Sequence, residues 1–396
     1  MSRRIMSLSA GRMDRTGTTF DSLYDFSPTN EQSPQLDPLA LAREFYHGLG
    51  DVVDGSAKGA PGPARLADIA QFGVVYTLVR QLARLLGCTP DLAAVAIERN
   101  RRTTQGFGAY AEFLYRDAGI VGTVVDSDLP PGAPGLELIP GRVMRLFQMG
   151  PAIDRLLAEC DTYEALLAGY LAALEQAIRV DGFVGVKSHL AEVAGLDAPL
   201  PSPQETRAAL CAAKQGDPIA YRALYAAVFA ATLAACQELD APVHLHTGIT
   251  GGTWGGSIGN ADPFLLASWL SRPEFRASKV VLLHAGYPWV EQASMMAHAF
   301  PQVWVDISWV TPWTSLRATE CMRAFLAAAP LSRLMIGSGG HGTPEVAWLG
   351  AIVAKIALSA ALDEAVAHNL LAKESAPRIA AMVLHENAAR LYGLEE

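Results

Sequence analysis

The stretch Pro242-Val243-His244-Leu245-His246-Thr247-Gly248 places two histidines two residues apart at the end of a short apolar run. Residues two apart on a β-strand point to the same face of a sheet, so His244 and His246 leave one face together. A glycine-rich stretch, 248–256, follows the run. In a closed parallel barrel this loop would open at the carboxyl end of the strand, where such barrels carry their chemistry. The pair is either two core histidines or part of a metal or acid–base site.

Composition predicts a globular protein that acts on small molecules. Of 396 residues, 51% are hydrophobic and 18% are charged, which is ample material for a large core. The formal net charge is −9 without long runs of Lys or Arg, so neither nucleic acid nor an anionic membrane is an expected partner. The five cysteines are scattered and form no C-x-x-C pair, which is typical of reduced thiols in a cytoplasmic protein. Neither a signal peptide nor a membrane-spanning apolar run is recognised, and a homo-oligomer is expected.

The pattern of the chain divides it into three parts. Residues 1–62 are poor in periodic pattern but contain a candidate first strand from Thr18 to Phe26. Residues 63–118 carry three helical patterns in succession, which predicts an inserted helical cap. Residues 119–396 are expected to form the remainder of the barrel.

Further apolar runs bring the number of expected strands to eight. They lie at 119–126, 136–146, 182–188, 242–247, 279–286, 303–308 and 334–341. Helical patterns separate most of them, and this alternation predicts an α/β protein with a parallel sheet. Eight such units predict a (β/α)₈ TIM barrel with an N-terminal helical insertion. The doubly wound alternative would need a glycine-rich phosphate loop after its first strand, and none is present.

Polar residues recur at similar places in successive strands. They are Lys187, His244 with His246, His284, Asp306, and His341 just beyond the last strand. One such histidine is usually a core residue, but a titratable group at five consecutive strand ends is better explained by one shared site at the barrel mouth. Imidazoles and a carboxylate there could hold a divalent metal with an open coordination position.

Several blocks resemble the amidohydrolase superfamily, and within it the branch related to the amidohydrolase-like domain fused to glutamine synthetase. The blocks are FVGVKS (183–188), PVHLHTG (242–248), VVLLHAGYPWVEQASMMAHAFPQVWVDIS (280–308), GSGGHGTPEVAWLGA (337–351) and HENAARLYGL (385–394). The resemblance implies a metal-dependent (β/α)₈ barrel that hydrolyses carbon–nitrogen bonds in amides, although some members decarboxylate. It also implies D-x-H-x-H on strand one, a lysine or other residue ending strand four, histidines ending strands five and six, and an aspartate ending strand eight.

The sequence departs from that pattern at three positions. Alignment of D-x-H-x-H with residues 21–25 replaces both histidines, by Leu23 and Asp25. At strand eight Gly339 stands where the resemblance implies the aspartate that activates water. A binuclear site is therefore not expected. The prediction is one divalent metal, zinc or manganese, or none, with ligands drawn from Asp25, His244, His246 and His284.

The remaining site predictions concern catalysis and substrate binding. Lys187, His284 and His341 are the candidate catalytic residues, with His341 an alternative proton carrier whose other interpretation is a loop residue that binds the glycine-rich turn. Tryptophans in the loops after strands five to seven suggest an apolar pocket wall, and a carboxylate follows Pro344. These candidate substrate-binding residues are Trp254, Trp289, Trp309, Trp313 and Glu345. For the tryptophans the alternative is packing between barrel and helices, and for Glu345 it is the helix dipole.

Three hypotheses for function remain open at this stage. The first is an enzyme that hydrolyses an amide or glutamyl-type bond of a small, partly apolar molecule. The second is a member that has lost hydrolysis and binds a partner. The third is a non-hydrolytic lyase, cyclase or acyl-transfer enzyme of a biosynthetic pathway.

Overall fold

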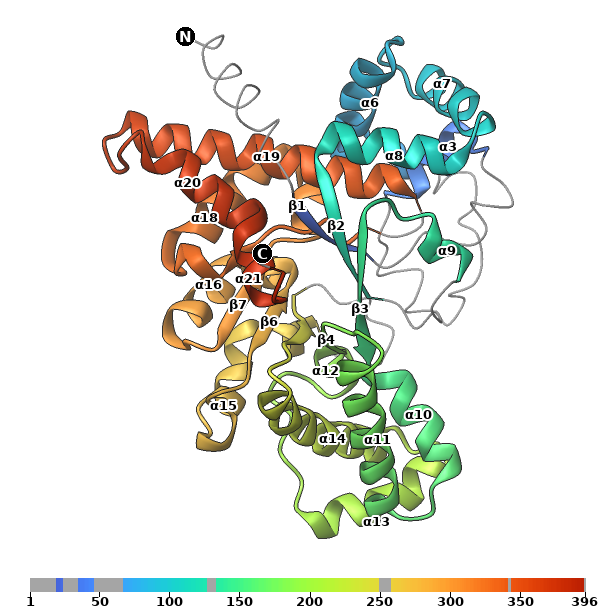
Figure 1. The fold of residues 1–396 in the computed structure, drawn as a ribbon, viewed down its shortest axis with the longest axis vertical. Coiled ribbons are helices and arrows are strands. Elements are labelled where there is room, and N and C mark those ends of the chain that lie inside the picture. The colour runs from blue at the N-terminus through green and yellow to red at the C-terminus, as the bar shows by residue number, and fades with distance from the viewer. Residues whose placement is uncertain are drawn as a thin grey trace.

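The computed structural model describes residues 19–23, 35–45, 67–126, 133–248, 258–340 and 343–394, with the backbone alone for 19–23. At its centre is a parallel sheet in which each strand pairs with the next along the chain (Figure 1). The strands are β1 (Thr19–Leu23), β2 (Ile120–Val125), β3 (Arg142–Gln148), β4 (Gly185–Ser188), β5 (Val243–His246), β6 (Val280–Leu283), β7 (Val303–Asp306) and β8 (Leu334–Met335). This sequential order of eight parallel strands separated by helices is that of the TIM barrel, so the predicted fold class is confirmed.

Helices between β1 and β2 form a layer at one end of the molecule (Figure 1). They are α3 (Pro38–Arg43), α6 (Gly73–Leu86), α7 (Leu92–Thr104) and α8 (Phe107–Ala118). Asp91 begins α7 by accepting hydrogen bonds from two backbone N–H groups of its first turn. Gly87 ends α6 in a left-handed conformation. The predicted helical insertion is thus built from short helices with ordinary start and stop signals.

The later helices follow the strands and cover the sheet. They are α9 (Pro134–Glu137), α10 (Met149–Glu159), α11 (Tyr163–Arg179), α12 (Leu190–Val193), α13 (Pro203–Lys214), α14 (Pro218–Glu238), α15 (Ala267–Leu270), α16 (Val290–Ala299), α17 (Val310–Trp313), α18 (Ala318–Ala328), α19 (Pro344–Ala367), α20 (Ser375–Ala381), the π-helical turn η7 (Met382–Glu386) and α21 (Asn387–Leu391). A capping box of Ser202 and Glu205 starts α13, and the Asp217 carboxylate starts α14.

The strand predicted at 136–146 is shorter than expected. Its first part is the helical turn α9, and β3 begins only at Arg142. The reason lies at Gly141, whose φ of +82° is left-handed and whose added Cβ would meet the Val121 carbonyl oxygen at 2.5 Å. The chain therefore turns sharply at Gly141, against β2, before it can extend.

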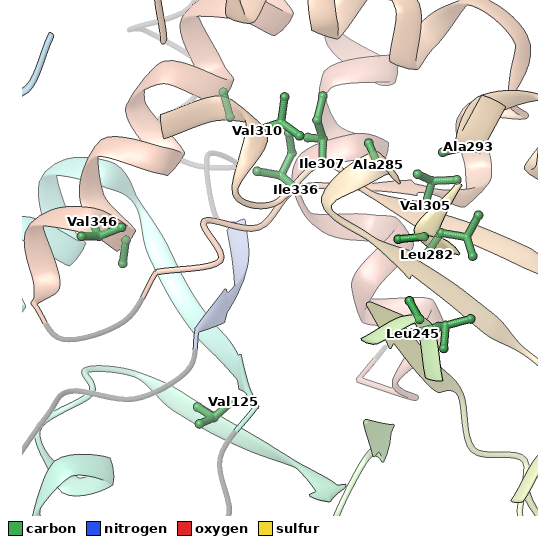
Figure 2. Close-up of a cluster of buried hydrophobic side chains, with 14 of the residues drawn as sticks. Val125, Leu245, Leu282, Ala285, Ala293, Val305, Ile307, Val310, Ile336 and Val346 are labelled. Atoms are coloured by element: carbon green, nitrogen blue, oxygen red, sulfur yellow. The ribbon is translucent and has the colours of Figure 1, made fainter. Parts of the chain in front are cut away.

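The two faces of the sheet pack differently. Leu245, Leu282 and Val305 are cross-strand partners on β5, β6 and β7, and they belong to the main core together with Ala293 of α16 (Figure 2). They therefore form the face that meets the surrounding helices. Because side chains alternate along a strand, His244 and His246 point to the opposite, inner face.

The inner face packs against the C-terminal segment. Val281, Leu283 and Met335 form a separate cluster with Leu391 of α21. Tyr392, directly after α21, stacks on the His244 ring with ring centroids 5.8 Å apart. Residues near the end of the described chain thus supply part of the barrel interior.

Two helices, α14 and α19, are long and apolar enough to cross a membrane by length and composition alone. Of the most apolar window of each, 56% and 72% respectively is buried within the fold. Their burial identifies them as core helices of a globular protein.

Candidate metal centre and active site

Two histidines and a glutamate meet at the carboxyl ends of β4 and β5. His189 directly follows β4, and the helix α12 that begins there brings Glu192 back beside it one turn later. The register pairs Ser188 with Leu245, so the next residues, His189 and His246, are neighbours. One ligand atom from each of His189, Glu192 and His246 lies within 4.8 Å of the others, and His246 Nδ1 is 3.2 Å from Glu192 Oε1.

Burial controls the protonation of this group. It raises the pKa of Glu192 to about 8, an effect opposed by the positive charge of Lys187. Burial also lowers the pKa of His189 well below its usual value, and the Lys187 charge lowers it further. Neutral imidazole is the form that binds a metal. The surroundings therefore hold His189 in the metal-binding form.

Lys187 lies in the interior beneath these residues. Its side chain is 1% exposed and forms an ion pair with Asp126, the residue after β2. The other oxygen of Asp126 accepts a hydrogen bond from Gln148 Nε2 at 2.7 Å. Carbamylation would turn the Lys187 amine into an anion facing the Asp126 carboxylate, which this arrangement disfavours. The observed contact of Lys187 is thus a buried ion pair with Asp126.

His284, immediately after β6, lies beside His246. The ring centroids of the two histidines are 4.5 Å apart, in an edge-to-face arrangement. Nδ1 of His284 is 3.0 Å from the Ser308 hydroxyl oxygen. Asp306, at the end of β7, accepts the Ser308 backbone N–H at 2.6 Å. Burial raises the pKa of Asp306 to about 6, although hydrogen bonds from Ser308 and from the His284 backbone oppose the shift.

Aromatic rings continue the site from His284. The Trp309 ring centroid is 6.1 Å from that of His284 and 5.2 Å from that of Trp313. Both tryptophans belong to the turn that follows β7, as the sequence predicts. Trp289 lies just before α16, in the loop after β6. The structure thus places Trp309 beside His284, and Trp313 beside Trp309.

His244 lies apart from this group although it shares the inner face with His246. Its Nε2 is 3.2 Å from the Tyr392 hydroxyl, and the ring is almost fully buried. Burial and the Lys187 charge lower the pKa of His244 to about 3, so the ring is neutral at ordinary pH. Among the described residues, the group of candidate ligands contains His246 but neither His244 nor His284.

Glu345 forms a buried ion pair with Arg99. Its carboxylate accepts a hydrogen bond from Arg99 Nε of α7 at 2.7 Å, and both side chains are 0% exposed. The pair joins the helical insertion to the first turn of α19. Asp25, Trp254 and His341 lie outside the described residues, so their predicted roles stay predictions.

Gly339 lies after β8, at the position where the sequence resemblance implies an aspartate. Its φ is +59°, and an added Cβ would lie 3.0 Å from both the backbone nitrogen and the Cβ of Trp309. Non-glycine residues rarely adopt this conformation, and the neighbouring backbone leaves little room. A side chain at this position would therefore strain the backbone and require Trp309 to shift slightly.

Sequence reasoning missed His189, Glu192 and Asp126 as site residues. His189 lies two residues after Lys187, which is the spacing of one strand face, and H-L-A-E (189–192) is the spacing of one helical turn. Both spacings are present in the sequence, but each covers too few residues to stand out as a pattern. The only signal for Asp126 in the sequence is that it is an acidic residue at the end of the expected strand 119–126.

Comparisons with known proteins agree with this architecture. Protein fluG of Emericella nidulans is 32% identical over 156 residues, which cover 39% of this chain and 18% of that protein. The match thus spans less than one fifth of the length of that relative.

Solved structures match nearly the whole chain. A protein of Lactobacillus casei, provisionally assigned as a metal-dependent hydrolase, superposes with a TM-score of 0.78 at 20% identity and covers 98% of this chain and 97% of its own. A uronate isomerase of Thermotoga maritima superposes with a TM-score of 0.68 at 15% identity and covers 99% of this chain and 98% of its own. At such identities these likenesses show the fold alone.

The family model for amidohydrolases matches residues 165–394, which is more than half of the chain and includes β4 to β8. The matched region also contains His189, Glu192, His246 and His284. The chain therefore belongs to the amidohydrolase family.

Proposed function

We propose that this protein is a metal-dependent hydrolase that cleaves an amide or glutamyl-type carbon–nitrogen bond in a small, partly apolar molecule. The observation that carries the proposal is the convergence of one ligand atom each from His189, Glu192 and His246 within 4.8 Å. Membership of the amidohydrolase family supports the same chemistry. The small-molecule substrate, the cytoplasmic location and a homo-oligomeric state belong to this proposal as expectations.

The donor set fits one divalent metal. Two imidazole nitrogens and one carboxylate form the usual protein ligand set of a catalytic zinc, which leaves a position open to water or substrate. His189 and His246 would supply the imidazoles and Glu192 the carboxylate. A divalent metal bound there supplies a Lewis acid that polarises a carbonyl and makes a water more acidic.

The chain's own residues account for proton movement and substrate placement. His284, whose ring contacts that of His246, is placed to take a proton from the attacking water and to deliver one to the leaving nitrogen. Trp309 and Trp313 provide apolar surface for the substrate beside that histidine. Burial, together with the Lys187 charge, lowers the His189 pKa and keeps that imidazole neutral.

Metal analysis combined with turnover tests the proposal. Protein purified without chelators and without an affinity histidine tag should contain about one zinc or manganese per chain. It should also hydrolyse members of a panel of γ-glutamyl amides and N-acyl compounds. His246→Ala and Glu192→Gln should lose the metal and at least about 100-fold in kcat/KM, since each removes one ligand.

His298→Ala is the matched control for those variants. His298 is an exposed histidine on α16 whose ring bonds the Ala328 carbonyl, away from the candidate ligands. This variant should keep both metal and activity. Full metal content in His246→Ala and Glu192→Gln, or equal loss in His298→Ala, would refute the metal assignment.

A second candidate function is non-hydrolytic chemistry, such as a lyase or cyclase step, in the same site. The observation that favours it is Gly339, which has no acid–base side chain at the position where the sequence resemblance implies the aspartate that activates water. Release of ammonia or an amine from the panel would support hydrolysis. Conversion of an unsaturated or cyclisable substrate analogue without uptake of ¹⁸O from labelled water would favour the second candidate. Metal binding without turnover of any compound would instead indicate a binding member.

A further inference from the structure

Two of the three candidate metal ligands, His189 and Glu192, lie on one short turn of the chain. His189 directly follows β4, and Glu192 belongs to α12, which is only four residues long. A helix of a single turn has little stability of its own, because forming the first turn fixes several residues for one hydrogen bond. Contacts with the rest of the molecule must therefore hold these two side chains in place.

A tyrosine of α14 holds the start of this turn. The Tyr225 hydroxyl oxygen accepts the His189 backbone N–H at 2.9 Å. The hydroxyl oxygen of Ser188, the last residue of β4, lies 3.4 Å from the same tyrosine oxygen. Tyr225 and Ser188 are both completely buried. The point at which β4 passes into α12 is thus fixed by a side chain from a different, much longer helix.

The far end of the turn is tied to the strand that carries His246. The Leu196 backbone N–H donates to the Asn260 carbonyl oxygen at 2.9 Å. Asn260 belongs to η1 (Ile258–Ala261), whose last carbonyl oxygen accepts the Gly248 backbone N–H at 2.9 Å. Gly248 lies two residues after His246. The end of the turn is therefore joined to β5 through η1, and its start is joined to α14.

We propose that Tyr225 is a positioning residue for the candidate metal centre, because its hydroxyl fixes the start of α12 so that His189 and Glu192 meet His246. The effect on metal binding rests on the proposed function, whereas the anchoring of the His189 backbone is a property of the metal-free protein. A metal site needs its ligands held to within about 0.5 Å. Loss of the anchor should therefore weaken metal binding although every ligand is still present.

A catalytic role for the Tyr225 hydroxyl does not fit its surroundings. A group that transfers a proton must reach the substrate, and this hydroxyl is completely buried with its oxygen bonded to the His189 backbone. Tyr225 therefore acts through the turn and touches no substrate in this role.

The other alternative is an ordinary core tyrosine whose hydroxyl needs only some partner. Tyr170 of α11 is such a residue and supplies the matched control. It is completely buried, and its hydroxyl oxygen lies 2.9 Å from that of Thr232, which also belongs to α14. Tyr170→Phe and Tyr225→Phe each remove one buried hydroxyl that contacts or belongs to the same helix. Only Tyr225→Phe removes a contact with the turn that carries the candidate ligands.

Hydrogen exchange of the metal-free full chain tests the anchor. Deuterium uptake is followed by mass spectrometry in peptides that span residues 187–195, for wild type and both variants. Relative to peptides from β6 and β7, the amides of 189–195 should exchange at least about 10-fold faster in Tyr225→Phe and at the wild-type rate in Tyr170→Phe. Unchanged exchange of these amides in folded Tyr225→Phe overturns the proposal. If Tyr225→Phe does not fold, the wild type decides, and a His189 amide that exchanges as fast as an exposed one overturns the proposal.

Zinc affinity tests the consequence for the centre. Competition with a chromogenic chelator gives the Kd of zinc for each protein. Tyr225→Phe should raise this Kd at least about 10-fold, as is typical when a residue that orients a metal ligand is lost. Tyr170→Phe should keep the wild-type Kd. A wild-type Kd in folded Tyr225→Phe, or an equal rise in both variants, overturns the proposal.

The outcome is separable from that of the proposed function. Zinc binding that weakens in Tyr225→Phe, without hydrolysis of any panel compound, refutes the proposed function and supports this inference. A wild-type protein that takes up no zinc also refutes the proposed function, and exchange of the amides of 189–195 then decides the role of Tyr225. A zinc-dependent hydrolase whose exchange and zinc Kd are unchanged in Tyr225→Phe supports the proposed function and overturns this inference.

Discussion

Glu44, the residue that ends α3, lies beside the buried pair of Arg99 and Glu345. Burial and the negative charge of Glu345 raise its pKa from 4.5 to about 7. The folded protein therefore holds this proton more tightly than the unfolded chain, and stability falls as the pH rises from about 4.5 through about 7. Glu44→Gln removes the titration. We expect it to be more stable than wild type by about 1–3 kcal/mol at pH 8 and equally stable near pH 4.5, as measured by urea unfolding.

Gly339 makes a second residue-level prediction. Gly339→Ala should destabilise the protein by about 1–2 kcal/mol because of its positive φ and by a further contribution from the contact with Trp309. Gly87→Ala is the matched control, since Gly87 has a φ of +75° with nothing within 4 Å of an added Cβ. An equal loss of folding stability in the two variants would show that the contact with Trp309 does not add to the cost at Gly339.

Single side chains also show where sequence reasoning reaches its limit. The rule that parallel strands end at one edge was enough to predict that His246 and His284 lie together. The same rule could not predict that His244 has a different partner, because Tyr392, whose hydroxyl contacts His244 Nε2, is 148 residues away in sequence. Glu192 was missed because it belongs to a helix of one turn, too short to give a periodic signal.

The insertion helix α7 and the core helix α19 are joined by the buried Arg99–Glu345 pair. Loss of one partner leaves an uncompensated buried charge, so Arg99→Met or Glu345→Leu alone should cost about 3–5 kcal/mol. The double variant should recover most of that loss, because no charge is then left unpaired. Chemical denaturation of the two single variants and the double variant measures this coupling.

The exposed pair of Arg323 and Glu364 serves as the control for that prediction. Their side chains are 47% and 40% exposed, so its removal should cost no more than about 1 kcal/mol. If the Arg99 and Glu345 variants lost no more stability than the surface-pair variants, the buried pair would not be what anchors the helical insertion to α19. A changed KM with unchanged stability in a Glu345 variant would restore its predicted role in substrate binding.

Elements were predictable from sequence where the pattern was long. The long helical pattern that starts after Thr162 forms α11, Tyr163–Arg179, with Thr162 as its cap. The strand predicted at 136–146 was wrong in its first half, because apolar residues of a single helical turn and of a short strand look alike. Near the end of the chain the π-helical turn η7 separates α20 from α21, and α21 contacts the barrel interior.

Metal binding should be visible in the stability of the whole molecule. A ligand that binds only the folded state stabilises it by about 2.7 kcal/mol at one hundred times its Kd. Zinc added to chelator-treated protein should therefore raise Tm, and His246→Ala should abolish the rise while His298→Ala keeps it. Thermal scans with zinc, manganese and magnesium measure this. Magnesium should have the smallest effect, since it prefers oxygen ligands to imidazole.

The arrangement of the whole molecule was predictable because it follows from the alternation of strands and helices along the chain. Eight apolar runs separated by helices admit few other topologies, and short connections keep neighbouring strands in sequence order. The packing of the inner face was not predictable, because the sequence pattern of α21 does not indicate which side of the sheet it contacts. The candidate ligand group lies at the strand ends, and of its three residues only His246 was predicted from the sequence.

Because α21 and Tyr392 pack inside the barrel, the interior is completed only after this late segment has been synthesised. A nascent chain that has left the ribosome as far as β8 already contains every strand, yet Val281, Leu283 and Met335 still lack their partner Leu391. Folding that proceeds during translation must therefore pause with an open, apolar interior until the segment around 387–392 emerges. Chaperones that bind exposed apolar surface would find this protein in the interval between the emergence of β8 and that of α21.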